Sequence, residues 1–336
     1  MSVAMGQEVP AGQKGTQSDW RRVIVACLAA FVGALAVFFL TVIVIDPFDS
    51  GRFPTFMPSG SPDDRAPTIN ISRGRDPRFD AVLLGSSRAV LVDPRRIADL
   101  TGYRFVEMAA LGATVREQMT FLHWFGGHRP NVEAVIIATD QAWCELDPSL
   151  PGEVDFPYGL YSDSTLEYLK TTLSSRTLRF MKERIQYALG RMPGVDREGY
   201  YDSEAKIAWP GPSTAQRNWP MATTTTLPKV TLPGLRMLDA TLKEVPGEPF
   251  IVMWMPPYYV NALPPSGSEA ALDLEACKDA LREWTRRRGR ATFVDFAIDT
   301  PESADPRNFL DSDHARNRYI RLLEPRIAAA LNALKR

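Results

Sequence analysis

The sequence predicts an α/β domain built on a parallel sheet of about five strands and carried behind one membrane helix. Short apolar runs typical of buried strands alternate with segments of helical spacing around residues 80–140 and again after residue 250. One uncharged apolar stretch near the N-terminus is long enough to cross a bilayer. Proline, at 27 of 336 residues, favours loops over continuous helix between these parts.

The composition is that of an ordinary folded chain and excludes several classes of protein. Hydrophobic residues make up 45% and charged residues 24%, so the chain is neither disordered nor collagen-like. The net charge of −1 argues against nucleic acid as a partner. Three cysteines and three histidines are too few for a Cys-rich zinc module or a disulfide scaffold.

The apolar stretch Val23–Ile45 is predicted to be a transmembrane signal anchor. It holds 23 residues without a charge, and a helix of that length covers roughly 35 Å against a hydrocarbon core of about 30 Å. Its length and the lack of a small-residue cleavage site favour a retained anchor over a cleaved signal peptide. Arg21 and Arg22 precede it, which places the tail 1–22 in the cytoplasm and everything after Asp46 outside it.

This outward location changes the interpretation of the cysteines. Cys27 falls within the membrane helix, which leaves Cys144 and Cys277 as the pair exposed to an oxidising space. Both lie in apolar patterns. We therefore expect buried free thiols in preference to a disulfide.

Residues 46–78, which follow the anchor, are predicted to be a stalk, a linker or a wrap-around segment. They are rich in Pro, Gly, Ser and Asp and show no sustained hydrophobic period. The exported domain, residues 79–336, begins after them.

The exported domain shows the strand–helix alternation that predicts a parallel sheet with helices on both faces. We expect strands at Ala81–Leu84, Arg104–Met108, Ala134–Thr139, Phe250–Met255 and Ala291–Phe296. We expect helices at Pro94–Leu100, Thr114–Phe125, Glu269–Arg288 and about Ala315–Leu334. Reacting groups collect at the carboxyl ends of such strands.

An insertion of about residues 144–235 separates the third strand from the fourth. Its first part, Ser164–Leu189, has the spacing of one or two amphipathic helices. Its second part is irregular and contains the aromatic residues Tyr200, Tyr201, Trp209 and Trp219. These residues either form a sugar-stacking rim or pack onto the helices, and packing is the more common role.

Ser87, in Gly85-Ser86-Ser87-Arg88 after the first strand, is placed like a nucleophile. A serine on a tight turn between strand and helix presents its hydroxyl to solvent, near the backbone N–H groups of a helix N-terminus. The plainer alternative is a helix N-cap. A serine hydroxyl also needs an adjacent base.

His314 is the histidine positioned for that role, near the start of the terminal helix. Asp311 precedes it by three residues, so its carboxylate can reach the second ring nitrogen and fix the tautomer. The alternative is that His314 is an ordinary first-turn residue and Asp311 or Asp313 a cap. His123 lies in an apolar helical segment, and we expect it in the core.

Gly85-Ser86-Ser87-Arg88 after a strand, together with Asp311-x-x-His314, resembles the SGNH/GDSL hydrolase superfamily. The resemblance covers about residues 79–140 and 250–334. It implies a three-layer α/β/α, flavodoxin-like fold and an esterase, lipase, carbohydrate O-acyltransferase or deacetylase. With the anchor and Asp46-Pro47-Phe48, the chain is similar to bacterial envelope proteins of exopolysaccharide acetylation and teichoic-acid D-alanylation systems.

The resemblance implies roles for individual residues. Ser87 matches the nucleophile, His314 the base and Asp311 its orienting carboxylate. The backbone N–H groups of Ser87 and Gly112 match oxyanion donors.

The third block departs from the family pattern of Gly-x-Asn-Asp and reads Ala138-Thr139-Asp140-Gln141. If Asp140 takes the Asn position, its carboxylate repels the developing oxyanion, and the loss of one donor alone costs roughly 10²–10³ in rate. Gln141 is the alternative donor if the register differs by one.

Three further residues at this edge are candidates for substrate binding. Arg88 either binds a substrate anion or pairs with a nearby carboxylate. Pairing with a carboxylate is the more common role of such an arginine. Tyr258 and Tyr259 follow the fourth strand directly, and we expect them to line the cleft.

These observations predict a membrane-anchored serine esterase or O-acyltransferase acting on acyl esters of a cell-envelope polysaccharide. No metal or cofactor is implied. The alternative is a catalytically inactive scaffold that binds a glycan or a biosynthetic partner protein. In both cases we expect a single-pass protein of the bacterial inner membrane, with its C-terminal domain in the periplasm or another extracytoplasmic space.

Overall fold

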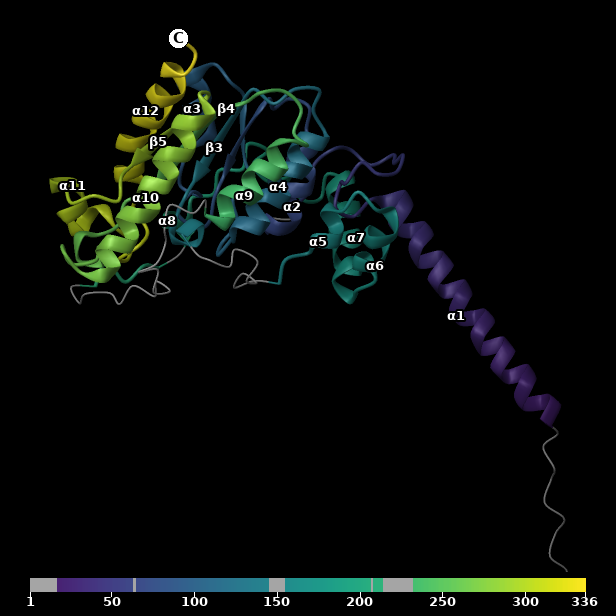
Figure 1. The fold of residues 1–336 in the computed structure, drawn as a ribbon. Coiled ribbons are helices and arrows are strands. Elements are labelled where there is room, and N and C mark those ends of the chain that lie inside the picture. The colour runs from purple at the N-terminus through teal and green to yellow at the C-terminus, as the bar shows by residue number, and fades with distance from the viewer. Residues whose placement is uncertain (1–16, 63–64, 145–154, 207, 214–231) are drawn as a thin grey trace, which may run out of the picture.

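The structure is a computed structural model that describes residues 17–62, 65–144, 155–206, 208–213 and 232–336 (Figure 1). Within them lies a five-stranded parallel sheet of order β2-β1-β3-β4-β5. This is the flavodoxin-like order, and it confirms the predicted fold class. The strands are β1 (Ala81–Leu84), β2 (Phe105–Glu107), β3 (Ala134–Ala138), β4 (Phe250–Met255) and β5 (Ala291–Asp295).

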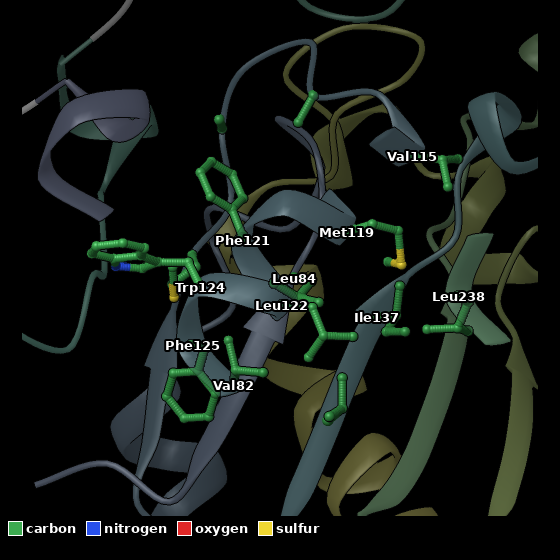
Figure 2. Close-up of a cluster of buried hydrophobic side chains, with 14 of the residues drawn as sticks. Val82, Leu84, Val115, Met119, Phe121, Leu122, Trp124, Phe125, Ile137 and Leu238 are labelled. Atoms are coloured by element: carbon green, nitrogen blue, oxygen red, sulfur yellow. The ribbon is translucent and has the colours of Figure 1, made fainter. Parts of the chain in front are cut away.

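Helices cover both faces of the sheet, which makes the domain three layers thick. Val82 and Leu84 of β1 face one core, while Ala81 and Leu83 face the other, as the two-residue period of a strand requires. Figure 2 shows side chains of α4 over Val82 and Leu84. The first core is closed by α2 (Ala66–Arg75), α4 (Val115–Gly127), α9 (Pro233–Leu242) and α10 (Glu269–Arg288), and the second by α3 (Pro94–Thr101) and α12 (Asn317–Ala333).

Local signals fix the helix boundaries. Thr114 and Glu117 form a capping box at the start of α4, and Asp93 caps α3. The helix α10 has the predicted bounds, and α12 begins two residues later than predicted. The shorter elements are α5 (Tyr158–Tyr161), α6 (Thr165–Thr172), α7 (Ser175–Ala188), α8 (Ser203–Lys206), α11 (Pro301–Ala304), η1 (Gln141–Cys144), η2 (Val260–Ala262) and η3 (Pro306–Asn308).

The N-terminal helix α1 (Gln17–Ile45) projects away from the domain (Figure 1). Its segment Trp20–Ile45 is long and apolar enough to span a membrane. Most of its side chains are exposed, whereas Val42 and Ile45 in the last turns are buried against the domain. A helix of this kind fits a single-pass membrane protein.

The described residues 46–62 and 65–78 wrap against the domain and contain helix α2, which the sequence did not predict. The carboxylate of Asp46 is buried and accepts hydrogen bonds from the Ser50 N–H (2.9 Å), the Ser50 hydroxyl (2.8 Å) and the Gly51 N–H (2.7 Å). Asp49 is buried as well and pairs with Arg75 and Arg184. The helix escaped detection because its buried face carries polar residues, so it shows no apolar period.

Cys144 and Cys277 form a disulfide. The expectation of free thiols is therefore wrong, although both residues are buried as predicted. Their apolar surroundings indicated burial. The pairing depends on η1 lying beside α10, and a sequence separation of 133 residues hides that neighbourhood.

The insertion contains the predicted helices, whereas His123 lies outside the core. The helices α6 and α7 confirm the amphipathic prediction for Ser164–Leu189. His123 is not in the core: its ring contacts Asp163 (3.3 Å) and Glu244 (2.9 Å), and its side chain is 37% exposed. It lies between buried Leu122 and Trp124, where the helical period turns outward.

Candidate active site

The candidate site lies where the loops after β1, β2 and β3 meet. The sheet order reverses between β1 and β3, and in such sheets the crevice at the carboxyl ends of these strands is the usual ligand site. Backbone hydrogen bonds join the loops: Met108 donates to Leu83 (2.8 Å) and Ala110 donates to Gly85 (3.2 Å). The loop that carries Gly112 is thereby fixed beside the turn that carries Ser87.

The turn after β1 needs glycine at its first position. A Cβ on Gly85 would lie 2.5 Å from the Cβ of Ala89 and 2.9 Å from that of Ala138, closer than side chains approach. Ser87 follows in a series of turns, while the N-cap of α3 is Asp93. The N-cap interpretation of Ser87 is therefore wrong, as is the idea that a helix begins beside its hydroxyl.

Ser87, His314 and Asp311 form a continuous hydrogen-bonded series. Ser87 Oγ lies 2.8 Å from His314 Nε2, and His314 Nδ1 lies 2.8 Å from Asp311 Oδ2. An ionised carboxylate only accepts, so Nδ1 carries the proton and Nε2 is the acceptor for the serine hydroxyl. This is the arrangement in which a histidine acts as general base.

Asp311 is held in its ionised form. Burial acts to raise the pKa of this carboxyl, but the hydrogen bond and charge of His314, together with the nearby Arg88, lower the pKa below its ordinary value. Its Oδ1 also accepts from the backbone N–H groups of Asp313 (2.7 Å) and His314 (2.9 Å). The same carboxylate therefore orients the ring and closes the backbone turn around it.

His314 lies in a loop that is closed on itself before α12 begins. An antiparallel bridge joins Phe309 to Ala315, and Leu310 N–H donates to the His314 carbonyl (2.8 Å). The N-cap of α12 is Arg316. The alternative of a first-turn histidine with an aspartate cap is therefore wrong.

Gly112 follows β2 and Asp140 follows β3, in the loops that border the turn carrying Ser87. Gly112 has a φ of +64°, a left-handed conformation that favours glycine. Its neighbour Leu111 lines the same cavity as Ser87. Asp140 is buried, accepts a hydrogen bond from the Ser86 hydroxyl, and accepts another from Ala142 N–H at 3.1 Å. Its side chain therefore accepts hydrogen bonds from the residue before Ser87 and from its own loop, and it is not among the residues that line the cavity beside Ser87. The side chain of Gln141 lies outside what the structure describes.

A cavity of about 70 Å³ opens beside Ser87 and His314, far below the roughly 300–1,000 Å³ of pockets for drug-sized ligands. The insertion contributes Trp209, whose ring centroid lies 5.4 Å from that of His314, and Ser203 from α8. The cavity is lined by Ser87, Arg88, Val90, Leu91, Leu111, Ser203, Trp209, Leu310, His314 and Ala315.

Of the three residues predicted to bind substrate, Arg88 lines the cavity and the two tyrosines do not. Arg88 lines the cavity, its Nη2 lies 3.7 Å from Asp313 Oδ2, and its guanidinium lies 4.1 Å from the ring centroid of Tyr258. Tyr258 and Tyr259 are both buried, and neither is among the residues that line this cavity. Tyr259 packs against Phe309 in the core under the histidine loop.

The aromatic residues of the insertion lie in two different places. Trp209 lines the cavity, while the Tyr200 hydroxyl hydrogen-bonds Asn317 (3.1 Å) and accepts from Arg321 (3.0 Å) on α12. Trp219 lies outside the described residues. Trp209 was among the aromatic candidates, but neither its contact with His314 nor the position of Ser203 could be read from the sequence, because both residues come from the irregular part of the insertion.

Comparison with known proteins adds no family: no protein-family model and no curated protein matches this chain.

Proposed function

We propose that this chain is a membrane-anchored serine esterase or O-acyltransferase of the SGNH/GDSL type, acting on acyl esters of a cell-envelope polysaccharide. The observation that carries the proposal is the series Ser87 Oγ–His314 Nε2 (2.8 Å) and His314 Nδ1–Asp311 Oδ2 (2.8 Å), set at the carboxyl edge of a parallel sheet.

In the proposed reaction, Ser87 Oγ attacks the acyl carbonyl as His314 Nε2 takes the hydroxyl proton. The tetrahedral intermediate expels the alcohol oxygen, which receives that proton from His314, and leaves the acyl group on Ser87. Water or a sugar hydroxyl then attacks the acyl-enzyme as His314 takes its proton; the bond between the acyl carbon and Ser87 Oγ breaks, and Oγ receives that proton back from His314. Asp311 stabilises the imidazolium formed in each half-reaction, and backbone N–H groups of Ser87 and Gly112 face the oxyanion.

Three further features support an extracytoplasmic setting and a small acyl group. Disulfides persist in oxidising compartments, and Cys144–Cys277 lies in the domain carried by the membrane helix. Arg21 and Arg22 before that helix favour a cytoplasmic N-terminus. The cavity of about 70 Å³ beside Ser87 suits a short acyl group such as acetyl better than a long chain.

A specific observation also favours a second candidate, a catalytically inactive scaffold that binds a glycan or a biosynthetic partner. Asp140 presents a buried carboxylate where the resemblance leads one to expect an amide donor. A carboxylate beside the developing oxyanion opposes the charge that the transition state must carry.

The two candidates are separated by assaying the full chain in detergent for hydrolysis of a soluble acetyl ester and for acetyl transfer to or from an acetylated polysaccharide. The esterase proposal predicts turnover that Ser87→Ala abolishes while glycan binding remains. Turnover unchanged in Ser87→Ala would refute the assignment of the nucleophile. Glycan binding without turnover in the unmodified protein would favour the scaffold.

A further inference from the structure

The helices α6 and α7 carry apolar residues on the face that they turn away from the domain. Leu166 and Leu173 of the α6 segment are 62% and 55% exposed, and Leu178 and Leu189 of the α7 segment are 58% and 60% exposed. The spacings of seven and eleven residues place each pair on one helix face. A helix on the surface of a soluble domain normally turns polar residues to solvent.

The inner faces of the same helices account for their attachment to the domain. Tyr168 of α6 and Phe180 and Met181 of α7 are buried in the main core. The exposed leucines are therefore a second apolar surface. We use the name leucine face for the exposed apolar side chains of the two helix segments together, which are Leu166, Leu173, Leu178, Ile185 and Leu189.

Basic side chains are interspersed with the leucine face. Lys170 lies between Leu166 and Leu173 at helical spacing, and Lys182 lies between Leu178 and Ile185. Both lysines are exposed, and Lys170 also pairs with Glu167 on the same helix (2.8 Å). Leucine with lysine on one face is typical of helices that lie in a membrane interface, where the lysine stem crosses the apolar boundary and its ammonium meets anionic headgroups.

The position of the membrane helix puts a bilayer beside this surface. The helix α1 packs against α7, and Val42 and Ile45 share a core with Phe180. The stretch of α1 from Trp20 to Thr41, before the buried turns, covers about 33 Å at 1.5 Å per residue, close to the thickness of a hydrocarbon core. The bilayer surface therefore falls where α1 meets α7. Figure 1 shows α6 and α7 at the end of the domain from which α1 leaves, with α12 at the opposite end.

We propose that the leucine face rests on the bilayer that α1 crosses, with its leucines at the acyl boundary and Lys170 and Lys182 among anionic lipid headgroups. The occupant is lipid, because α7, which carries part of the leucine face, packs against the membrane helix, and because the face has the interfacial combination of leucine and lysine. The domain is thus attached to the membrane at two places, which fixes its tilt. This inference does not depend on the proposed enzymatic activity.

The test measures how deep single labels lie in the full chain, reconstituted in nanodiscs that contain anionic lipid. Cys27→Ala removes the free thiol, the Cys144–Cys277 disulfide is kept, and a nitroxide is attached at Leu178→Cys or at Leu322→Cys. Leu322 on α12 is the matched control, since it is also 58% exposed but lies at the far end of the domain. Both sites are on the surface, so neither label disturbs the core.

We expect the label at position 178 to be accessible to oxygen and shielded from a water-soluble nickel chelate, and the label at 322 to show the reverse. Lys182→Gln should reduce the ratio of docked to undocked domain about fivefold, because a lysine near an anionic surface contributes about 1 kcal/mol. Nickel accessibility at position 178 equal to that at 322 would overturn the proposal. That result would leave a protein partner as the occupant of the leucine face.

Discussion

The hydrogen-bonding groups of His314 and Asp311 differ in character from those of the loop that carries Asp140. On one side, His314 and Asp311 supply an acceptor for the serine proton and a carboxylate that orients the ring, and each polar atom of the series has a complementary neighbour. On the other side, the buried Asp140 accepts hydrogen bonds from the Ser86 hydroxyl and the Ala142 N–H. In the proposed reaction, the oxyanion needs a hydrogen-bond donor on this side, and an ionised carboxylate can only accept.

The base side of the site depends on a locally closed loop, whereas the other side depends on one side chain. The base side is a local unit: Asp311 and His314 are three residues apart, and the loop around them is closed by the Phe309–Ala315 bridge. The side where we propose that the oxyanion lies depends on loops from separate strands and on the identity of Asp140 after β3. A single substitution there changes its electrostatic character without moving the base.

The largest effect is expected from Asp311→Asn, which tests the base side. The amide cannot stabilise the imidazolium, and it can favour the wrong tautomer of His314, so acetyl-ester hydrolysis should fall by roughly 10⁴-fold. The rate is measured with the full chain in detergent. Asp313→Asn is the control within the same loop and should have a much smaller effect, since Asp313 faces Arg88. Equal losses in both variants would contradict the role assigned to Asp311.

The next effect concerns stability on the oxyanion side. Cys144 ends η1, four residues after Asp140, and its disulfide to Cys277 ties this loop to α10. Replacing both cysteines by serine should lower the free energy of unfolding by about 2–4 kcal/mol, because the denatured chain is no longer cross-linked. Denaturant unfolding of the full chain in detergent measures it. An unchanged midpoint would mean that the bridge contributes nothing to stability.

Elements with a local sequence pattern could be predicted from the sequence, whereas features that depend on contacts between distant residues could not. The strands were predictable because apolar runs such as Ala134–Ala138 are buried on both faces of the sheet. The helix α2 was not, because its buried residues include Asn70, Ser72 and Arg73, whose polar groups find partners only in the folded domain. The disulfide was missed for a related reason: its partners are neighbours in space alone.

The candidate site divides in the same way. Ser87, Asp311 and His314 stand in short local patterns, and the structure brings the three together. The cavity walls Trp209 and Ser203 come from an irregular insertion, so no spacing in the sequence pointed to the contact between Trp209 and His314. The contact of Ser86 with Asp140 joins two strand ends 54 residues apart and follows only from the pairing of β1 with β3.

A smaller effect in the opposite direction is expected from Asp140→Asn. The amide removes a negative charge from beside the oxyanion and introduces an N–H donor, so hydrolysis should rise by about 10- to 100-fold. Asp140→Ala removes the charge without adding a donor and should give a smaller rise. A fall in rate for Asp140→Asn, in protein of unchanged stability, would show that the carboxylate is needed as it stands.

The central claim is that Ser87 is a nucleophile activated by His314, and the most direct measurement is covalent labelling with a fluorophosphonate probe, with the modified residue mapped by mass spectrometry. We expect one phosphonyl group per chain, on Ser87. Labelling should be lost in Ser87→Ala and strongly slowed in His314→Gln. Labelling on another residue, or a folded protein that resists the probe entirely, would contradict it.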